Sequence, residues 1–360
     1  RYERKTKLVC EDEAFRFPED VQEGDALIVF TKRAVLDIAG RLERMGVRAS
    51  VIYGSLPPEI RRRQIRMFSG HETKVVVATD AIGMGLNLPV KRIVFVHTSK
   101  FDGKNTRPLL AAEIKQIGGR AGRYGIYDTG YVNAVGQEGL DYIKEHFDEK
   151  EPDVSCVSLG FPQVLLDMDE PLDAILKIWK SVATEPPFEK ISIEDMLFLY
   201  EKAYRDRKEI DGFEDKHMLY RMLTCSIDIK NRDIVTLWLY YCKTYTADAC
   251  LHFPALIMCS DSGLARYETF YKMLDLYYQF SVRLGKNIDL ERLDREREKT
   301  EETIMRYLAK NKKEYIQKCQ YCGSLLPLGA SFRICDKCFA ETRKSKGGRR
   351  HLWTGATAGG

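Results

Sequence analysis

The amino-acid sequence predicts a parallel α/β sheet domain, followed by an all-α helical bundle and a small cysteine-rich module. Three observations predict this order. Up to about residue 155, β-branched runs alternate with helical segments, which is the pattern of a parallel sheet with helices on both faces. Strand signals then give way to helical periodicity over residues 156–318. Two CxxC pairs come after it.

The composition narrows the class of protein. With 360 residues, of which 44% are hydrophobic and 31% charged, the chain resembles a soluble protein of two or three domains. No apolar run approaches the roughly 20 residues of a membrane span. Residues 1–7 are charged with no apolar segment behind them, so we expect no secretory signal. A net charge of only +4 means that nucleic-acid binding would depend on local basic patches.

The elements of the sheet domain follow in order. Thr31 is the expected N-cap of the first helix, and Pro57 and Pro58 open the second. The expected strands are residues 6–10, 26–30, 47–53, 75–78 and 92–98. The expected helices are residues 32–44, 58–68 and 109–117. Functional groups of parallel sheets collect at the carboxyl ends of the strands.

Two glycine-rich segments stand at such positions. ATDAIGMGLNLP follows the buried strand at residues 75–78, and QIGGRAGR ends the helix at residues 109–117. In the second segment Arg120 and Arg123 lie among glycines that let the backbone approach a ligand closely, which suits a polyanion. An arginine that reaches a phosphoryl group during transfer stabilises the charge of the transition state. The alternative is a pair of surface salt bridges.

Both segments resemble motifs V and VI of superfamily 2 helicases. LIVFTKRAVLDIA at residues 27–39 and IYGSLPPEIRRRQIRMF at residues 52–68 resemble motifs IV and IVa. The residues of these motifs are most similar to those of the ATP-dependent RNA helicase of the mitochondrial degradosome, the suppressor-of-Var helicase, and its bacterial relatives. The resemblance covers the first 150 residues and continues more diffusely beyond them. It implies the second of two RecA-like motor domains, the first being absent from this chain.

The resemblance also implies roles for individual residues. Arg120 and Arg123 would reach the γ-phosphate of ATP, with Arg123 the preferred arginine finger. Ser55 and Thr79 would contact RNA phosphates, although the basic helix after Ser55 also fits a solvated face. The implied nucleotide contacts are Gln116, Asp80, Gly83, Gly85 and Asn87. The implied cofactor is ATP with Mg²⁺, and movement along RNA would be 3′ to 5′.

Partners and rival functions follow from the same comparison. The implied partners are RNA, the upstream RecA-like domain of the same protein and an exoribonuclease. GxxxxGK[ST] does not occur in the sequence, so we expect no ATP hydrolysis by this chain alone. Three alternatives stay open: a non-catalytic nucleic-acid-binding module, a scaffold with an inactive motor, and a DNA helicase of the same superfamily. Backbone contacts discriminate poorly between RNA and DNA.

Residues 156–318 are expected to form a helical accessory domain, which the resemblance makes part of an RNA channel. Aromatic residues on the helix at 263–284 share one face, which favours a packed core over base stacking. The last and most charged helix is expected to act as a solvated strut. The expected helices are residues 171–182, 193–207, 216–227, 231–245, 263–284 and 290–318.

The cysteine module has the spacing of a metal site. Cys319, Cys322, Cys335 and Cys338 form CxxC–x₁₂–CxxC, which suits a structural tetrahedral Zn²⁺, whereas two disulfides are the alternative. Gly323 is expected to have a positive φ. The module spans residues 319–342, before a basic flexible tail at 343–360. Because the mitochondrial relatives are not expected to carry this module, the sequence favours a bacterial, cytoplasmic protein.

Overall fold

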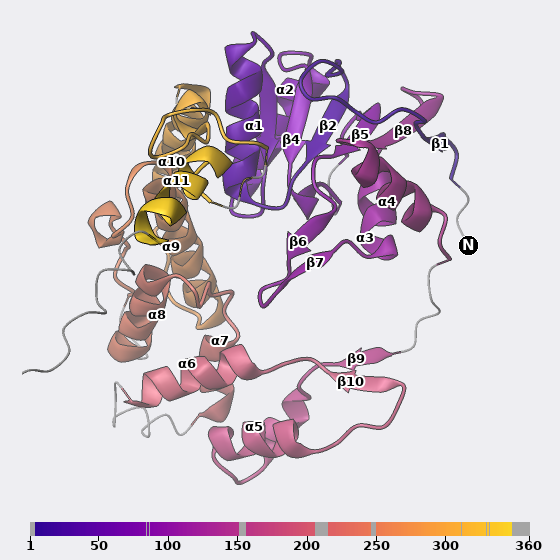
Figure 1. Ribbon diagram of the computed structural model, residues 1–360. Helices are drawn as coiled ribbons and strands as arrows, with labels where there is room; N and C mark the ends of the chain where they lie inside the picture. Colours follow the sequence, from indigo (N-terminus) through magenta and orange to yellow (C-terminus); the bar gives the residue numbers. More distant parts are fainter. Residues whose placement is uncertain are drawn as a thin grey trace, which may run out of the picture. The chain divides into compact units, whose positions relative to one another are not determined.

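The computed structural model divides the chain into two compact units (Figure 1). The first unit combines Arg1–Lys150 with Leu308–Gly360, and the second is Glu151–Tyr307. The structure describes residues 4–83, 85, 87–150, 156–205, 215–245, 250–310, 312–328, 330 and 332–347. Arg349 and Arg350 of the expected basic tail lie outside the described residues. The division into two units does not test the predicted division into a sheet domain, a helical domain, a cysteine module and a tail, which stays a prediction.

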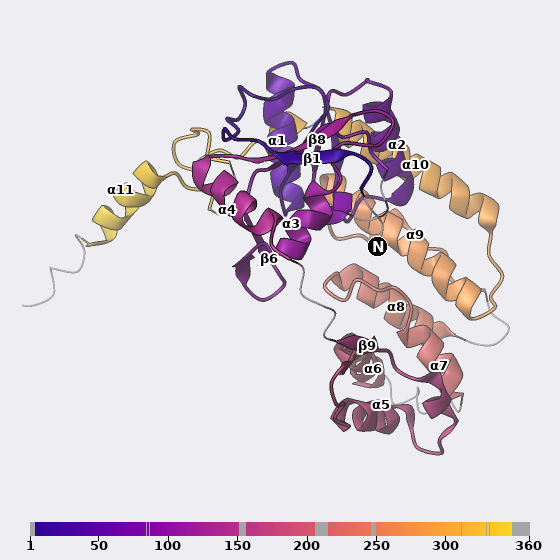
Figure 2. The ribbon, with the colours of Figure 1, turned by 90° about the vertical axis from the view of Figure 1, so that its right-hand side faces the viewer.

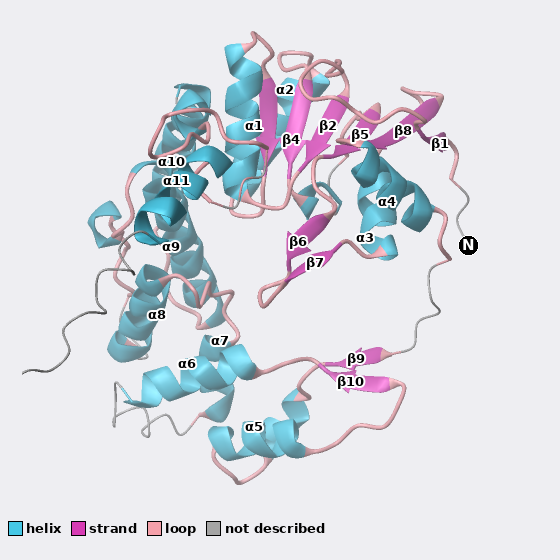
Figure 3. Cartoon of the chain, in the orientation of Figure 1, coloured by secondary structure: helices cyan, strands magenta, loops and turns pink. Residues whose placement is uncertain are grey.

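The first unit is built on a six-stranded sheet in which all paired neighbours are parallel (Figure 3). The strand order is β1-β8-β5-β2-β4-β3. The strands are Lys7–Cys10 (β1), Asp25–Ile28 (β2), Ala49–Ile52 (β3), Val75–Ala78 (β4), Arg92–Phe95 (β5) and Thr129–Ala134 (β8). All residues of β2, β3, β4 and β5 are buried, as expected for parallel strands covered on both faces.

Helices cover the two faces in the way that right-handed crossovers require. The chain moves from β2 past β4 to β3 through α1, and it returns from β3 to β4 through α2. Because the two connections run in opposite directions along the sheet and both are right-handed, α1 and α2 lie on opposite faces. One face packs against α2 (Pro58–Ser69), α3 (Ala111–Gly118) and α4 (Gln137–Phe147). The other face packs against α1 (Lys32–Arg44), which contacts β3 and β4. Figure 2 shows α3 and α4 side by side.

The outer side of α1 is covered by the chain's C-terminal segment. A 3-10 turn, Lys312–Tyr315, packs on α1. The backbone N–H of Gln317 donates to Asp37 Oδ1 (2.8 Å), and Lys312 Nζ donates to the carbonyl oxygen of Ala49 (2.9 Å). Burial lowers the pKa of Lys312. Asp37 is fully buried, so α1 has a polar but covered outer side.

The second unit is helical, with a core around Trp238, Tyr241 and Phe280. Trp238 Nε1 donates to the carbonyl oxygen of Met222 (3.0 Å), so the largest buried side chain has its polar atom satisfied. No helix in the described part of the chain is long and apolar enough to span a membrane. The helices are Leu172–Ser181 (α5), Glu194–Arg205 (α6), Lys216–Leu223 (α7), Arg232–Thr244 (α8), Gly263–Arg283 (α9) and Leu290–Lys310 (α10).

Several elements differ from the sequence-based expectation. The structure contains a short parallel ladder in the helical unit, β9 (Val157–Leu159) with β10 (Phe188–Lys190). It also contains a hairpin, β6 (Ser99–Phe101) with β7 (Thr106–Pro108). Strands of three residues are too short to show a period. The helix expected at residues 290–318 ends at Lys310, because the chain then turns onto α1.

Gly40 marks the closest approach between α1 and the C-terminal segment. A Cβ at this position would overlap the carbonyl oxygen of Lys312. We expect Gly40→Ala to lower the free energy of unfolding by about 1–3 kcal/mol through overpacking, although alanine alone would favour a helix by up to about 1 kcal/mol. Urea unfolding measures the change. Limited trypsin proteolysis at Lys312 tests whether the segment has left α1.

Gly160→Ala is the control for this substitution. A Cβ at Gly160 would meet no atom within 4 Å, so its stability should remain near that of the wild type. A Gly40→Ala variant as stable and as protease-resistant as the wild type would contradict the described packing.

Candidate functional site

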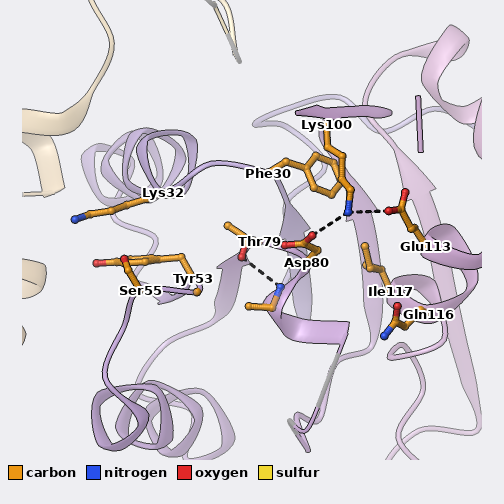
Figure 4. A pocket seen from close by; sticks show the side chains of 12 residues that line it. Phe30, Lys32, Tyr53, Ser55, Thr79, Asp80, Lys100, Glu113, Gln116 and Ile117 are labelled. Atoms are coloured by element: carbon orange, nitrogen blue, oxygen red, sulfur yellow. Dashed lines mark hydrogen bonds and ion pairs between the residues drawn. The ribbon is translucent and has the colours of Figure 1, made fainter. Parts of the chain in front are cut away.

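A cavity of about 650 Å³ opens at the carboxyl ends of β2, β3 and β4 (Figure 4). Four residues that the sequence predicted as contacts, Ser55, Thr79, Asp80 and Gln116, lie in it. The lining residues are Phe30, Lys32, Tyr53, Gly54, Ser55, Thr79, Asp80, Ala81, Lys100, Glu113, Gln116 and Ile117. The structure thus brings together two residues predicted to contact RNA and two predicted to contact nucleotide.

Thr79 and Ser55 are positioned by the strands that precede them. The backbone N–H of Thr79 donates to the carbonyl oxygen of Ile52 (2.9 Å), and its hydroxyl accepts from the N–H of Ala81 (3.3 Å). Ser55 lies just before α2, whose N-cap is Pro57 and which no side chain caps. Uncapped N–H groups and the helix dipole make this end of α2 attractive to an anion.

The basic run on α2 is partly committed within the protein. Arg61 donates to the carbonyl oxygens of Gly54 (3.2 Å) and Leu56 (3.3 Å), so it holds the loop that carries Ser55. Arg62 pairs with Glu59. Arg61 therefore positions the loop before α2, and Arg62 neutralises the charge of Glu59 in the first turn of α2.

Lys100 on β6 crosses the cavity between two carboxylates, as Figure 4 shows. Its Nζ lies 3.2 Å from Asp80 Oδ2 and 2.7 Å from Glu113 Oε1. Glu113 also accepts two hydrogen bonds from Arg107 (2.8 and 2.9 Å). The Arg107 hydrogen bonds, followed by Lys100 and the N–H of Leu110, lower the pKa of Glu113 to about 2. Asp80 is thereby tied to the hairpin and to α3.

A second cavity, of about 410 Å³, holds the predicted arginines. Its lining residues are Arg4, Lys5, Thr6, Asn87, Leu88, Gly119, Arg120, Ala121, Gly122, Arg123 and Tyr124. Four of these are basic and none is acidic, which favours an anionic ligand. Gly83 and Gly85, which the sequence also predicted as nucleotide contacts, line neither of the two cavities. Gly85 is exposed and has a φ of 64°.

The two arginines differ in their surroundings. Arg120 Nε donates to the carbonyl oxygen of Gly83 (3.0 Å), and its Nη2 reaches the same atom. The guanidinium of Arg123 has no hydrogen-bond or ion-pair partner in the described part of the chain, while its carbonyl oxygen accepts from Ile126 and Tyr127. Arg120 is therefore engaged in holding the loop, and Arg123 is available to a ligand.

The arginine loop is held against the sheet by a close backbone approach. The N–H of Gly122 donates to the carbonyl oxygen of Val90 (2.8 Å). Gly122 has a φ of 72°, and a Cβ there would lie 2.6 Å from the backbone of Gly130 on β8. Only glycine meets both conditions, so the predicted glycine spacing has a steric cause.

Sequence reasoning missed two groups of site residues. Arg4 donates to the carbonyl oxygens of Gly119 (2.7 Å) and Ala121, and burial lowers its pKa. Lys5 lies over the ring of Tyr124. Lys100, Glu113 and Arg107 were missed as well, whereas Asp80, the other partner of Lys100, had been predicted. None of the missed residues belongs to a motif, and the only signal was the high charge of the first seven residues.

The four predicted cysteines lie together. Their Sγ atoms are all within 4.8 Å of one another, and Cys322 Sγ lies 3.7 Å from Cys335 Sγ. A tetrahedron with Zn–S bonds of about 2.3 Å has edges of about 3.8 Å, whereas sulfurs of a disulfide lie about 2.05 Å apart. The N–H groups of Cys322 and Cys335 lower the pKa of Cys319 to about 6. Gly323 has the expected positive φ, 71°.

Comparison with known proteins shows which proteins this chain resembles. Residues 7–125 match the helicase conserved C-terminal domain. The chain is 32% identical to the mitochondrial ATP-dependent RNA helicase SUV3 of Oryza sativa, over 79% of this chain and 51% of the rice protein. It is 43% identical to that of Saccharomyces paradoxus, over 34% of this chain and 17% of the yeast protein. The resemblance to superfamily 2 helicases of the SUV3 type is confirmed.

The sheet unit accordingly resembles the C-terminal domain of SUV3-type helicases, with a RecA-like parallel sheet and helices after it. The chain spans about half the length of the rice relative and less of the yeast one. A solved C-terminal domain of the DEAD-box protein Dbp5 is 21% identical, over 41% of this chain and 86% of that chain, with a TM-score of 0.31.

The predicted bacterial, cytoplasmic location is wrong. The SUV3 relatives from rice, two Saccharomyces species and Candida albicans are all named as mitochondrial proteins, which points to the mitochondrion. The cysteine module was given too much weight in that prediction, because a small appended module carries no information on compartment.

The carboxylate of Glu113 gives a test of the Lys100 and Arg107 cluster. Its pKa falls from an ordinary 4.5 to about 2 in the folded state, so its contribution to stability is present above pH 4.5 and is lost as the pH falls toward 2. We expect Glu113→Gln to lower Tm at pH 7. The difference from wild type should shrink through this pH window in thermal unfolding experiments.

Glu72→Gln removes the same charge from an exposed site and serves as the control. If Glu113→Gln and Glu72→Gln changed Tm equally at every pH, the cluster would not stabilise the fold.

Proposed function

We propose that the chain is the C-terminal part of an ATP-dependent RNA helicase that moves on RNA by ATP hydrolysis between two RecA-like domains. One observation carries the proposal. Arg123, without a partner of its own in the described chain, lies in a basic cavity whose loop is fixed by Arg120 and Arg4. An arginine held ready beside an anion site is what phosphoryl transfer requires.

The residues of the second cavity fit the phosphate end of a nucleotide. Arg4, Lys5 and the two loop arginines supply positive charge without an acidic neighbour in the lining. ATP bound with Mg²⁺ supplies the free energy of the cycle, and we propose that an upstream RecA-like domain holds it. In this chain Arg123 would stabilise the developing charge, and Arg120 would keep the loop in place. Asn87 lines the same cavity and would approach the ribose.

The first cavity fits the nucleic-acid strand. Ser55, the hydroxyl of Thr79 and the uncapped end of α2 would hold backbone phosphates. Gln116 lines this cavity and Arg120 reaches Gly83 behind it, so Gln116, Asp80, Gly83 and Gly85 would link the strand to the nucleotide. Alternate opening and closing of the two domains would advance the strand 3′ to 5′.

RNA is the proposed substrate because the relatives are named RNA helicases. The helical unit would form part of the RNA channel, and an exoribonuclease would consume the released strand. A DNA helicase remains the alternative that fits the same backbone contacts. The available Arg123 favours a working motor over a non-catalytic binding module.

We further propose that Cys319, Cys322, Cys335 and Cys338 bind one structural Zn²⁺. The sulfur separations fit a tetrahedral site. Among the described residues of the module, the buried members of its cluster are Cys319, Leu326 and Cys338. A core of this size stabilises little, so the metal would supply most of the module's stability.

Hydrolysis of ATP, measured with and without RNA, tests the motor. We would compare this chain with its gene product including any residues encoded upstream of Arg1. We expect RNA-stimulated hydrolysis by the longer protein and none by this chain. Arg123→Ala should lower kcat about 10³-fold or more, as loss of an arginine finger does.

Arg44→Ala, an exposed arginine at the end of α1, is the matched control and should leave hydrolysis unchanged. Hydrolysis that survives Arg123→Ala would refute the finger assignment. A longer protein that neither hydrolyses ATP nor responds to RNA would support the binding-module alternative.

Metal analysis tests the zinc site. The purified chain should hold about one zinc ion, and Cys319→Ala or Cys335→Ala should lose it because three thiolates leave the tetrahedron open. Cys250→Ala, an exposed cysteine outside the cluster, should retain it. Zinc retained by both cluster variants would exclude the site.

A further inference from the structure

The zinc module carries its aromatic residues on the outside. Its three aromatic residues are Tyr321, Phe332 and Phe339, with exposed fractions of 61%, 75% and 48%. The small buried cluster is formed instead by Leu326 and two cysteines. Tyr321 and Phe332 are the two most exposed of these rings, so most of their surface is accessible to a ligand.

The module brings two of these rings onto neighbouring turns. The N–H of Gln320 donates to the carbonyl oxygen of Arg333 (2.9 Å), which places the turn carrying Tyr321 beside the turn carrying Phe332. Cys322 Sγ and Cys335 Sγ, from the same two turns, lie 3.7 Å apart. The cysteine cluster therefore fixes the spacing of the rings.

Exposed basic residues lie close to the rings along the chain. Lys318, Arg333 and Lys337 are all exposed, and each stands within three residues of an aromatic side chain. Directly after the module, RKSKGGRR at residues 343–350 adds five positive charges and no negative one. A protein partner would be expected to meet a broader apolar patch with fewer charges, whereas rings interleaved with cations suit unpaired nucleotides.

We propose that the zinc module binds single-stranded RNA by stacking bases on Tyr321 and Phe332. Lys318, Arg333 and Lys337 contact the phosphates between the stacked bases. Phe339, in the first turns of the last helix Asp336–Gly347 (α11), offers a third ring. The inference rests on the proposed RNA helicase function, and it assigns to the module a hold on the strand separate from that of Ser55 and Thr79.

Stacking predicts a loss that depends on the bases. The test measures fluorescence anisotropy of the full chain with a labelled single-stranded RNA of about 12 nucleotides, a length that spans several bases. Tyr321→Ala and Phe332→Ala should each raise Kd about fivefold or more. An oligonucleotide of the same length without bases should bind equally to wild type and variants. Phe332→Tyr, which keeps a ring, should retain RNA affinity.

Controls separate stacking from unfolding. Each variant must retain one zinc ion, and Phe332→Leu replaces Phe332→Ala if the alanine variant loses the metal. Met45→Ala, at the end of α1 and 49% exposed, should leave Kd unchanged. A double variant, Tyr321→Ala with Phe332→Leu, that keeps zinc and binds RNA within twofold of wild type would overturn the proposal. Equal losses on RNA and on the baseless strand would also overturn it.

Ser55→Ala distinguishes this inference from the proposed function. If Ser55→Ala weakens RNA binding and the ring variants do not, the motor contact stands and the module proposal fails. If only the ring variants weaken binding, the module holds the strand and the proposed Ser55 contact fails.

Discussion

The carbonyl oxygen of Gly83, held by the guanidinium of Arg120, joins the two parts of the candidate site. The turn that contains Gly83 begins at Asp80 in the first cavity, and the loop that contains Arg120 ends at Arg123 in the second. A second hydrogen bond, from the N–H of Gly122 to the carbonyl oxygen of Val90, holds the arginine loop against the residues just before β5. The two cavities therefore share backbone that is tied together by hydrogen bonds. In the proposed helicase, this shared backbone would link the RNA contacts to the nucleotide contacts.

Most of the sheet was predictable because burial on both faces leaves a strong pattern in the sequence, although β8 was not among the expected strands. Val75–Ala78 and the helix Lys32–Arg44 appear at the expected positions. The pair β9 and β10 was not predictable, since a ladder of three residues is decided by its partner and not by its own residues. The end of α10 at Lys310 was missed for a similar reason. Its charged sequence continues a helical pattern, while packing on α1 decides where the helix stops.

In the candidate site, too, the sequence predicted what local motifs determine and missed what distant contacts determine. Ser55, Thr79, Gln116 and Asn87 stand in local motifs, and the structure brings them to two cavities. Arg4 contacts a carbonyl oxygen 115 residues away, and the parallel pairing of β1 with β8 creates that proximity. No short pattern records such a neighbour. Motif reading therefore found the cavity residues that belong to local motifs and missed those that distant segments bring to the cavities.

The return of the chain to α1 after residue 308 has a consequence for how the units are connected. The helical unit is inserted into the sheet unit, because covalent links join them both before residue 156 and after Tyr307. Removal of the helical unit Glu151–Tyr307 would keep the sheet together with the C-terminal segment that covers α1. Truncation after Lys150 would remove that segment and expose the buried Asp37 and Gly40 to water.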